Sequence, residues 1–141
     1  MSRLISDLAG VQRGLITVVA AGSVSSVALV SGAVFVEGKA VTVTGQTTSK
    51  ETIMGYGNTG DPLRAIIEKY EDDGYMTVQN KGFKTAPGIS GSLPAANDFV
   101  CVNGAGAVSK VATQTAAGRG PAYAASVDNT AGENTVMVFI G

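Results

Sequence analysis

The sequence contains no histidine, no tryptophan and a single cysteine, Cys101. Without histidine, the chain lacks the side chain that most often transfers protons near neutral pH and most often binds metals. One thiol cannot form an intrachain disulfide, and neither a paired-cysteine zinc site nor a cysteine–histidine nucleophile is available. We therefore expect a protein that is not an enzyme, with no catalytic residue, cofactor or metal ion.

Charge is scarce as well. Ten lysines and arginines face eleven aspartates and glutamates, giving a net charge of −1. Proteins that bind nucleic acids usually present a clustered basic face that displaces counterions from phosphates. Here the basic residues are scattered singly, so nucleic acid is not an expected partner.

Glycine, valine, threonine, alanine and serine dominate instead, and the 19 glycines are spread along the whole length. This mixture suits short strands joined by tight turns and suits helices poorly. A chain of 141 residues is one domain's worth and can bury roughly 65–70% of its unfolded surface in a single core. We expect one mostly-β domain over residues 15–141.

The longest uncharged run extends from Leu15 to Val36. A membrane span is one interpretation, and the apolar region of a signal peptide ending near Ala21 is another. Two glycines, four serines and a threonine interrupt the run, which is rich in valine rather than leucine. These features favour buried strands, and we expect no membrane partner.

The first fourteen residues differ from the rest. Ser2 can cap a helix and Gly14 can end it. Four apolar side chains fall on one helical face: Leu4, Ile5, Leu8 and Val11. The segment is either a short terminal helix folded onto its own core or an arm that docks on a neighbouring subunit. In both cases the four apolar side chains need a partner.

Strand signals follow one another from Leu15 onward, which predicts roughly nine or ten strands in an up-and-down or Greek-key barrel or a sandwich. Gly45 to Gly60 is polar, which predicts a surface loop or an excursion of the chain at the edge of a sheet. The last run is apolar on both faces, as in a strand that is central in a sheet, covered by a helix or buried at a subunit contact. The clearest runs are Leu15–Ala20, Val27–Val36, Val41–Thr44, Tyr75–Gln79, Phe99–Val102, Ala107–Val111, Ala122–Val127 and Thr135–Ile140.

Residues 63–70 fit two structures. Asp61 could cap a helix with Pro62 at its first position, and an apolar face would follow. Alternatively, Leu63–Tyr70 and Tyr75–Gln79 form a hairpin around the turn Glu71–Gly74. We favour the hairpin because the surrounding sequence is β.

Two groups of acidic and amide side chains have the composition of a cation site. Consecutive residues in a turn point in different directions and are solvated, so neither group is expected to close a coordination shell. We interpret both as solvated turns. They are Glu71, Asp72 and Asp73 in one turn and Asp128, Asn129 and Glu133 in the other.

The remaining motifs also have structural interpretations. Alternation places Cys101 on the same strand face as Phe99, as a small buried hydrophobe. Ser109 and Lys110 are adjacent and would face opposite sides of a strand, so they form no catalytic dyad. The glycines of Gly104–Gly106 lack the third glycine of a dinucleotide-binding loop and predict a β-turn.

The second half of the chain resembles a known family. Residues 97–110 have the pattern of a strand, a glycine-rich turn and a second strand that contains Val-Ser-Lys. This pattern resembles a segment of the small decoration (cement) proteins of bacteriophage capsids. Ala122–Val127 and Thr135–Ile140 are similar to the closing hairpin of that family, and Leu63–Gly82 is similar to its middle hairpin. The resemblance covers residues 63–141.

This resemblance implies a compact β-barrel, β-tulip-like or related domain with an N-terminal arm or short helix over residues 1–14. Such a protein is expected on the outer surface of the virion, where it bridges major capsid subunits and stabilises the head, as a homo-oligomer with a trimer favoured. The resemblance places shell binding in the N-terminal segment, on Arg3, Leu4, Ile5, Leu8, Val11 and Arg13. The alternative function is a receptor- or carbohydrate-binding β module of a head fibre or tail tip.

Overall fold

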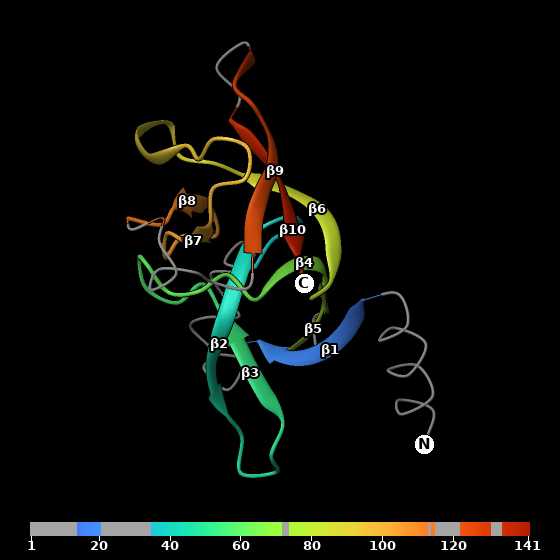
Figure 1. Ribbon diagram of the computed structural model, residues 1–141. Helices are drawn as coiled ribbons and strands as arrows, with labels where there is room; N and C mark the ends of the chain where they lie inside the picture. The colour runs from blue at the N-terminus through green and yellow to red at the C-terminus, as the bar shows by residue number, and fades with distance from the viewer. Residues whose placement is uncertain (1–13, 21–34, 72–73, 113, 115–121, 131–133) are drawn as a thin grey trace.

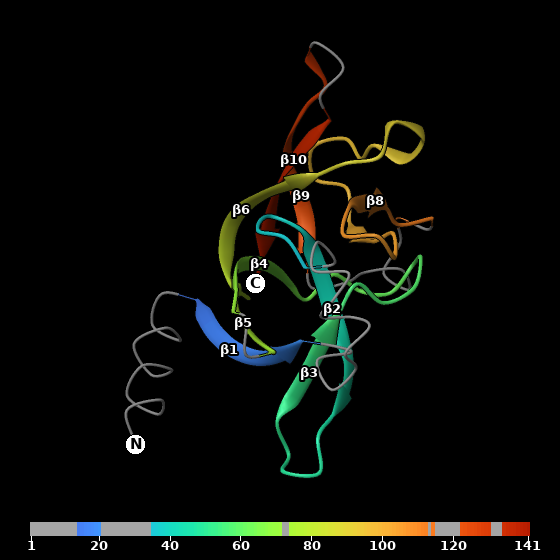
Figure 2. The ribbon, with the colours of Figure 1, turned by 180° about the vertical axis from the view of Figure 1, so that it is seen from behind.

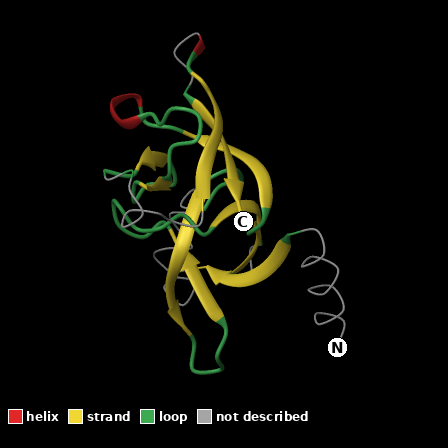
Figure 3. Cartoon of the chain, in the orientation of Figure 1, coloured by secondary structure: helices red, strands yellow, loops and turns green. Residues whose placement is uncertain are grey.

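The computed structural model describes residues 14–20, 35–71, 74–112, 114, 122–130 and 134–141. The part of the chain within these ranges contains ten strands, a 3₁₀ turn at Ser90–Ser92, a single 3₁₀ position at Thr130 and no α-helix (Figure 3). The strands are β1 (Leu15–Ala20), β2 (Ala40–Gln46), β3 (Thr52–Gly55), β4 (Ala65–Tyr70), β5 (Tyr75–Gln79), β6 (Gly82–Pro87), β7 (Val100–Val102), β8 (Val108–Lys110), β9 (Ala122–Asp128) and β10 (Thr135–Ile140). The mostly-β prediction is confirmed.

Five strands close into a barrel in the order β1-β3-β2-β4-β5, and β5 pairs back with β1 (Figure 1). The β1–β3 pair is parallel and short, joining Val19 to Ile53 and Ala20 to Met54. The other four pairs are antiparallel. The barrel is therefore mixed, which a purely up-and-down connection cannot produce.

The rest of the described chain forms two smaller sheets. One has the order β6-β10-β9, and the other is the β7–β8 hairpin. The view from behind shows β6, β9 and β10 above the barrel and β8 to the side of them (Figure 2).

Two clusters of buried side chains hold these layers together. The first fills the barrel with Val18, Ala20, Phe35, Val41, Met54, Ala65, Ile67, Met76 and Val78. The second lies between the barrel wall and the two smaller sheets and contains Ala40, Leu63, Ile66, Ala86, Val100, Val102, Val108, Ala122, Ala124, Val136, Val138 and Ile140.

Strand β4 contributes to both clusters. Ala65 and Ile67 point into the barrel, whereas Ile66 points into the second cluster, and all three are fully buried. Successive side chains of a strand face opposite sides of the sheet. A strand covered on both faces therefore needs a continuous apolar run, which explains why this segment also fitted an amphipathic helix.

The hairpin prediction for residues 63–79 is confirmed, because β4 and β5 pair antiparallel across the predicted turn. The helix alternative is wrong. The β7–β8 and β9–β10 hairpins also form where the sequence predicted them. Most of the predicted strand Val27–Val36 lies outside the described residues, and its described end, Phe35 and Val36, is not in a strand.

Two strands were not predicted. Gly45–Gly60 was expected to be a loop or edge excursion, but β3 lies within it and buries Met54 in the barrel. Strand β6 was also not recognised. Strand β6 pairs with β10, which is distant in sequence, whereas β3 pairs with its sequence neighbour β2 across a register shift and with the distant β1 over two residue pairs.

The run considered as a membrane or signal segment begins with strand β1, and residues 21–34 of it are not described. None of the helices within the described ranges has the length and apolar character needed to cross a membrane.

Candidate binding surface

Strand β10 is the central strand of its sheet, as its sequence allowed. Its inward side chains, Val136, Val138 and Ile140, are buried in the second cluster. Its outward side chains, Met137 and Phe139, have no described layer above them, and Met137 is 39% exposed. The second apolar face of β10 is therefore a surface of the described chain.

Three aromatic rings form a row across this surface. Phe139 pairs with Phe83 on β6 and with Tyr123 on β9. The ring centroids of Phe83 and Phe139 lie 4.9 Å apart, and those of Tyr123 and Phe139 lie 5.2 Å apart. Phe83 is 57% exposed. Phe83, Tyr123, Met137 and Phe139 are called the aromatic face below.

The register of the sheet makes this row possible. Between Met137 and Val138 the β9–β10 pairing shifts by one residue, which leaves Ala125 as an extra residue in β9. Such a bulge changes which side chains of the strand face outward beyond it. It keeps Tyr123 on the outer face beside Phe139.

The outer side of the sheet carries almost no charge. Strand alternation places Thr85 and Pro87 of β6, Ser126 of β9 and Thr135 of β10 on the same side as the rings. Asp128 of β9, which pairs with Thr135, lies on this side too, at the opposite end of the sheet from the rings, and it is the one carboxylate that the three described strands place there. Depletion of charge together with aromatic and methionine side chains is typical of the centre of protein interfaces.

The edge of the sheet at β6 is less suited to binding another strand. Lys84 points inward from β6 and forms an ion pair with Glu68 of β4. Pro87 ends the strand and has no amide hydrogen to donate. Inward-pointing charges and prolines are features that protect edge strands from pairing. The face of this sheet is therefore better suited to docking than its edge.

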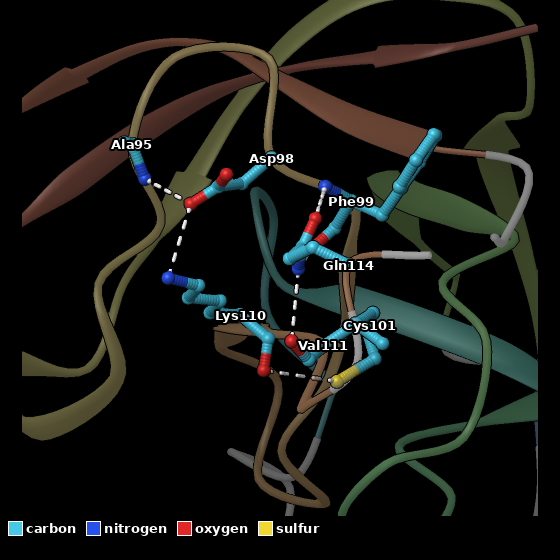
Figure 4. A network of polar contacts seen from close by, with 7 residues as sticks. All are labelled: Ala95, Asp98, Phe99, Cys101, Lys110, Val111 and Gln114. Carbon is cyan, nitrogen blue, oxygen red and sulfur yellow. Dashed lines mark hydrogen bonds and ion pairs between the residues drawn. The ribbon is translucent and has the colours of Figure 1, made fainter. Parts of the chain in front are cut away.

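A polar network near Cys101 fixes the β7–β8 hairpin (Figure 4). The Gln114 side chain accepts a hydrogen bond from the Phe99 amide at 2.6 Å and donates to the carbonyls of Phe99 and Val111 at 2.9 and 2.8 Å. Asp98 accepts from the Ala95 amide at 2.8 Å. These bonds join side chains to backbone, which is the pattern of a structural support.

The other predicted features of this hairpin are confirmed. Ser109 is buried and Lys110 is exposed, so they lie on opposite sides of β8. Asn103 accepts hydrogen bonds from the amides of Ala105 and Ala107, which closes the glycine-rich turn. The Lys110 ammonium group lies 3.5 Å from the Asp98 carboxylate.

The Cys101 thiol is buried, and its sulfur is 4.0 Å from the Lys110 carbonyl. Burial raises its pKa, and a backbone hydrogen bond from Gly60 opposes this shift. A raised pKa means that less of the nucleophilic thiolate is present at a given pH.

We predict that iodoacetamide alkylates Cys101 much more slowly in the native protein at pH 8 than in the urea-unfolded chain, as mass spectrometry can measure. The pKa of the Cys101 thiol is higher in the folded protein than in the unfolded chain. The neutral thiol therefore contributes its full stabilisation at pH values below the pKa of the unfolded chain. This stabilisation is lost as pH rises through the folded pKa. Equal alkylation rates in the two states would contradict the burial.

The two acidic turns, interpreted above as solvated turns rather than cation sites, show no convergent ligands where they are described. The Lys69 ammonium nitrogen lies 3.7 Å from a Glu71 carboxylate oxygen. Asp72 and Asp73 lie outside the described residues. Asp128 is exposed, and hydrogen bonds from the Thr130 side chain and from the Thr130 amide hold its pKa below the usual range. Within the described ranges, no three His, Cys, Asp or Glu side chains gather in a way that could hold a metal ion.

The predicted shell-binding residues all lie outside the described part of the chain. They are Arg3, Leu4, Ile5, Leu8, Val11 and Arg13. Their role therefore stays a prediction from the sequence.

No protein-family model matches the sequence, and a search of curated proteins gives no match.

The sequence indicated that the last strand is apolar on both faces, and this run includes Met137 and Phe139. Phe83 and Tyr123 were not recognised as members of the same surface. Alternation in Phe83-Lys84-Thr85-Ala86 was the available signal for β6. The tyrosines showed no cluster in the sequence. In the fold, Tyr123 joins two phenylalanines on the surface, whereas Tyr56 and Tyr70 pack against Phe35 of the barrel cluster.

Proposed function

We propose that this protein is a structural virion protein that binds the outer surface of a phage capsid. It stabilises the head by bridging neighbouring major capsid subunits. The observation that carries this proposal is the aromatic face, where Phe83 is 57% exposed on a sheet surface that is almost free of charge. Contiguous exposed apolar patches on soluble domains commonly mark protein-docking sites.

The resemblance to decoration proteins supports the same function. It depends on three hairpins, β4–β5, β7–β8 and β9–β10, and all three form in this fold. The N-terminal arm is the second proposed shell contact. A small face and a short arm are sufficient for stable decoration because many copies bind one lattice and each copy reinforces its neighbours.

The direct test is addition of the purified chain to undecorated shells of the cognate major capsid protein. We expect co-sedimentation with the shells and density on their outer surface in negative-stain images. The variant Phe83→Asp is expected to reduce occupancy at least tenfold, because a carboxylate would be desolvated in the contact. Val43→Asp, at a 50% exposed position on β2, is the matched control and should bind normally.

Absence of shell binding by the native chain would overturn the proposal. One observation favours a second candidate, a carbohydrate-binding module: Thr85 and Ser126 place hydroxyl groups beside the rings. Glycan binding that depends on Phe83, combined with no binding to shells, would support that candidate instead.

A further inference from the structure

The described chain begins beside the aromatic face. The Gly14 carbonyl accepts a hydrogen bond from the Asn80 amide at 2.7 Å. A β-carbon on Gly14 would lie 2.9 Å from the Lys81 carbonyl oxygen, so the two backbones are in contact. Phe83 follows Lys81 by two residues. The described chain therefore begins, at Gly14, against the β5–β6 turn and next to the end of the sheet that carries the rings.

The size of the face helps to identify its partner. Three strands spaced about 4.8 Å apart, each about 20 Å long, present roughly 300 Å². A stable interface between two protein molecules needs about 800 Å² from each partner. The aromatic face alone is therefore too small to hold a second copy of the protein stably in solution.

The N-terminal segment has the matching size. Thirteen residues in a helix are about 20 Å long, which is the length of the six-residue strands β6 and β10. One amphipathic helix laid across three strands covers such a face. The apolar stripe of the segment, Leu4, Ile5, Leu8 and Val11, supplies the complementary surface.

We propose that, in the free protein, residues 1–13 pack this apolar stripe on the aromatic face of the same chain. The two apolar surfaces then cover one another before the protein meets its partner. The packing does not depend on the proposed function, but its consequence does. Binding to a shell would separate arm and face, and each would exchange its intramolecular partner for the capsid protein.

Methionine methyl groups provide a site-specific test by NMR. Met137 lies on the aromatic face, whereas Met54 and Met76 are buried in the barrel and report whether the fold is intact. We compare the full chain labelled at the methionine methyls with the double variant Leu4→Asp/Leu8→Asp. The matched control is Ser6→Asp, which adds a carboxylate on the opposite side of the predicted helix.

We expect the double variant to move the Met137 resonance away from its native, ring-shifted position, and to leave those of Met54 and Met76 unchanged. Ser6→Asp should move none of the three. In the native chain, nuclear Overhauser effects should connect the Met137 methyl to the methyls of Leu4 or Leu8, which keeps the test valid if the double variant fails to fold.

An unmoved Met137 resonance in a folded double variant would overturn the proposal. So would a Met137 shift that disappears on dilution together with dissociation of an oligomer, because the arm would then lie on another copy. Neither result involves a capsid shell, so failure here is distinguishable from failure of the proposed function.

Discussion

Replacing Ile66 with alanine is expected to lower the free energy of unfolding by about 2–5 kcal/mol, as measured by urea denaturation. Ile66 is fully buried in the cluster between the barrel and the smaller sheets. Truncation removes apolar contacts and leaves a cavity that strands on both sides cannot close. Ile67→Ala, one residue further along β4, should have a similar effect through the barrel cluster.

The pair of variants also tests whether the described layers unfold as one domain. Because β4 contributes to both clusters, each variant should shift a single cooperative transition to lower urea. Val43→Ala, at an exposed position of β2, is the control and should change stability by less than about 0.5 kcal/mol. Two separate transitions, with each variant affecting only one, would show that barrel and smaller sheets are independent units.

Gly57→Ala is expected to lower the free energy of unfolding by about 2–5 kcal/mol. Gly57 has a φ of 67°, a left-handed conformation that costs other residues about 1–2 kcal/mol. A β-carbon there would overlap the Thr42 methyl group and lie 2.9 Å from an Asp61 carboxylate oxygen. Thr42 is only 3% exposed, so relieving the overlap adds about 1–3 kcal/mol.

Gly60 offers a matched control in the same loop. It also has a positive φ, 96°, but a β-carbon there would meet no atom within 4 Å. Gly60→Ala should therefore show only the conformational cost of about 1–2 kcal/mol. Equal losses for the two variants in thermal or urea unfolding would contradict the steric contribution of Thr42.

The hairpins were predictable because their signals are local. A glycine-rich tip between two alternating runs predicts β7–β8, and a polar turn between apolar runs predicts β4–β5 and β9–β10. The ambiguity at residues 63–70 had the same local origin. Ile66 and Ile67 are apolar neighbours because each faces a different cluster, and only the cover on both sides of β4 reveals this.

The barrel closure could not be predicted in the same way. It requires β1 to pair with β3 in parallel over two residue pairs and with β5 antiparallel over five. Pairing between strands far apart in the chain depends on register and on the packing of the whole core, and neither leaves a pattern in a short window of sequence. The same reason hid β6, whose partner β10 is far away in the chain.

For the candidate surface as well, some features are local in the sequence and others depend on the tertiary structure. By itself, the sequence determined that the chain is mostly β, that its last strand is apolar on both sides, and that its N-terminal segment carries an apolar stripe, because side-chain periodicity is a local property. Only the tertiary structure decided that Met137 and Phe139 are left uncovered by the described chain. It also placed Phe83 and Tyr123 beside them, because the register between β6, β10 and β9 brings together residues that are far apart in the sequence.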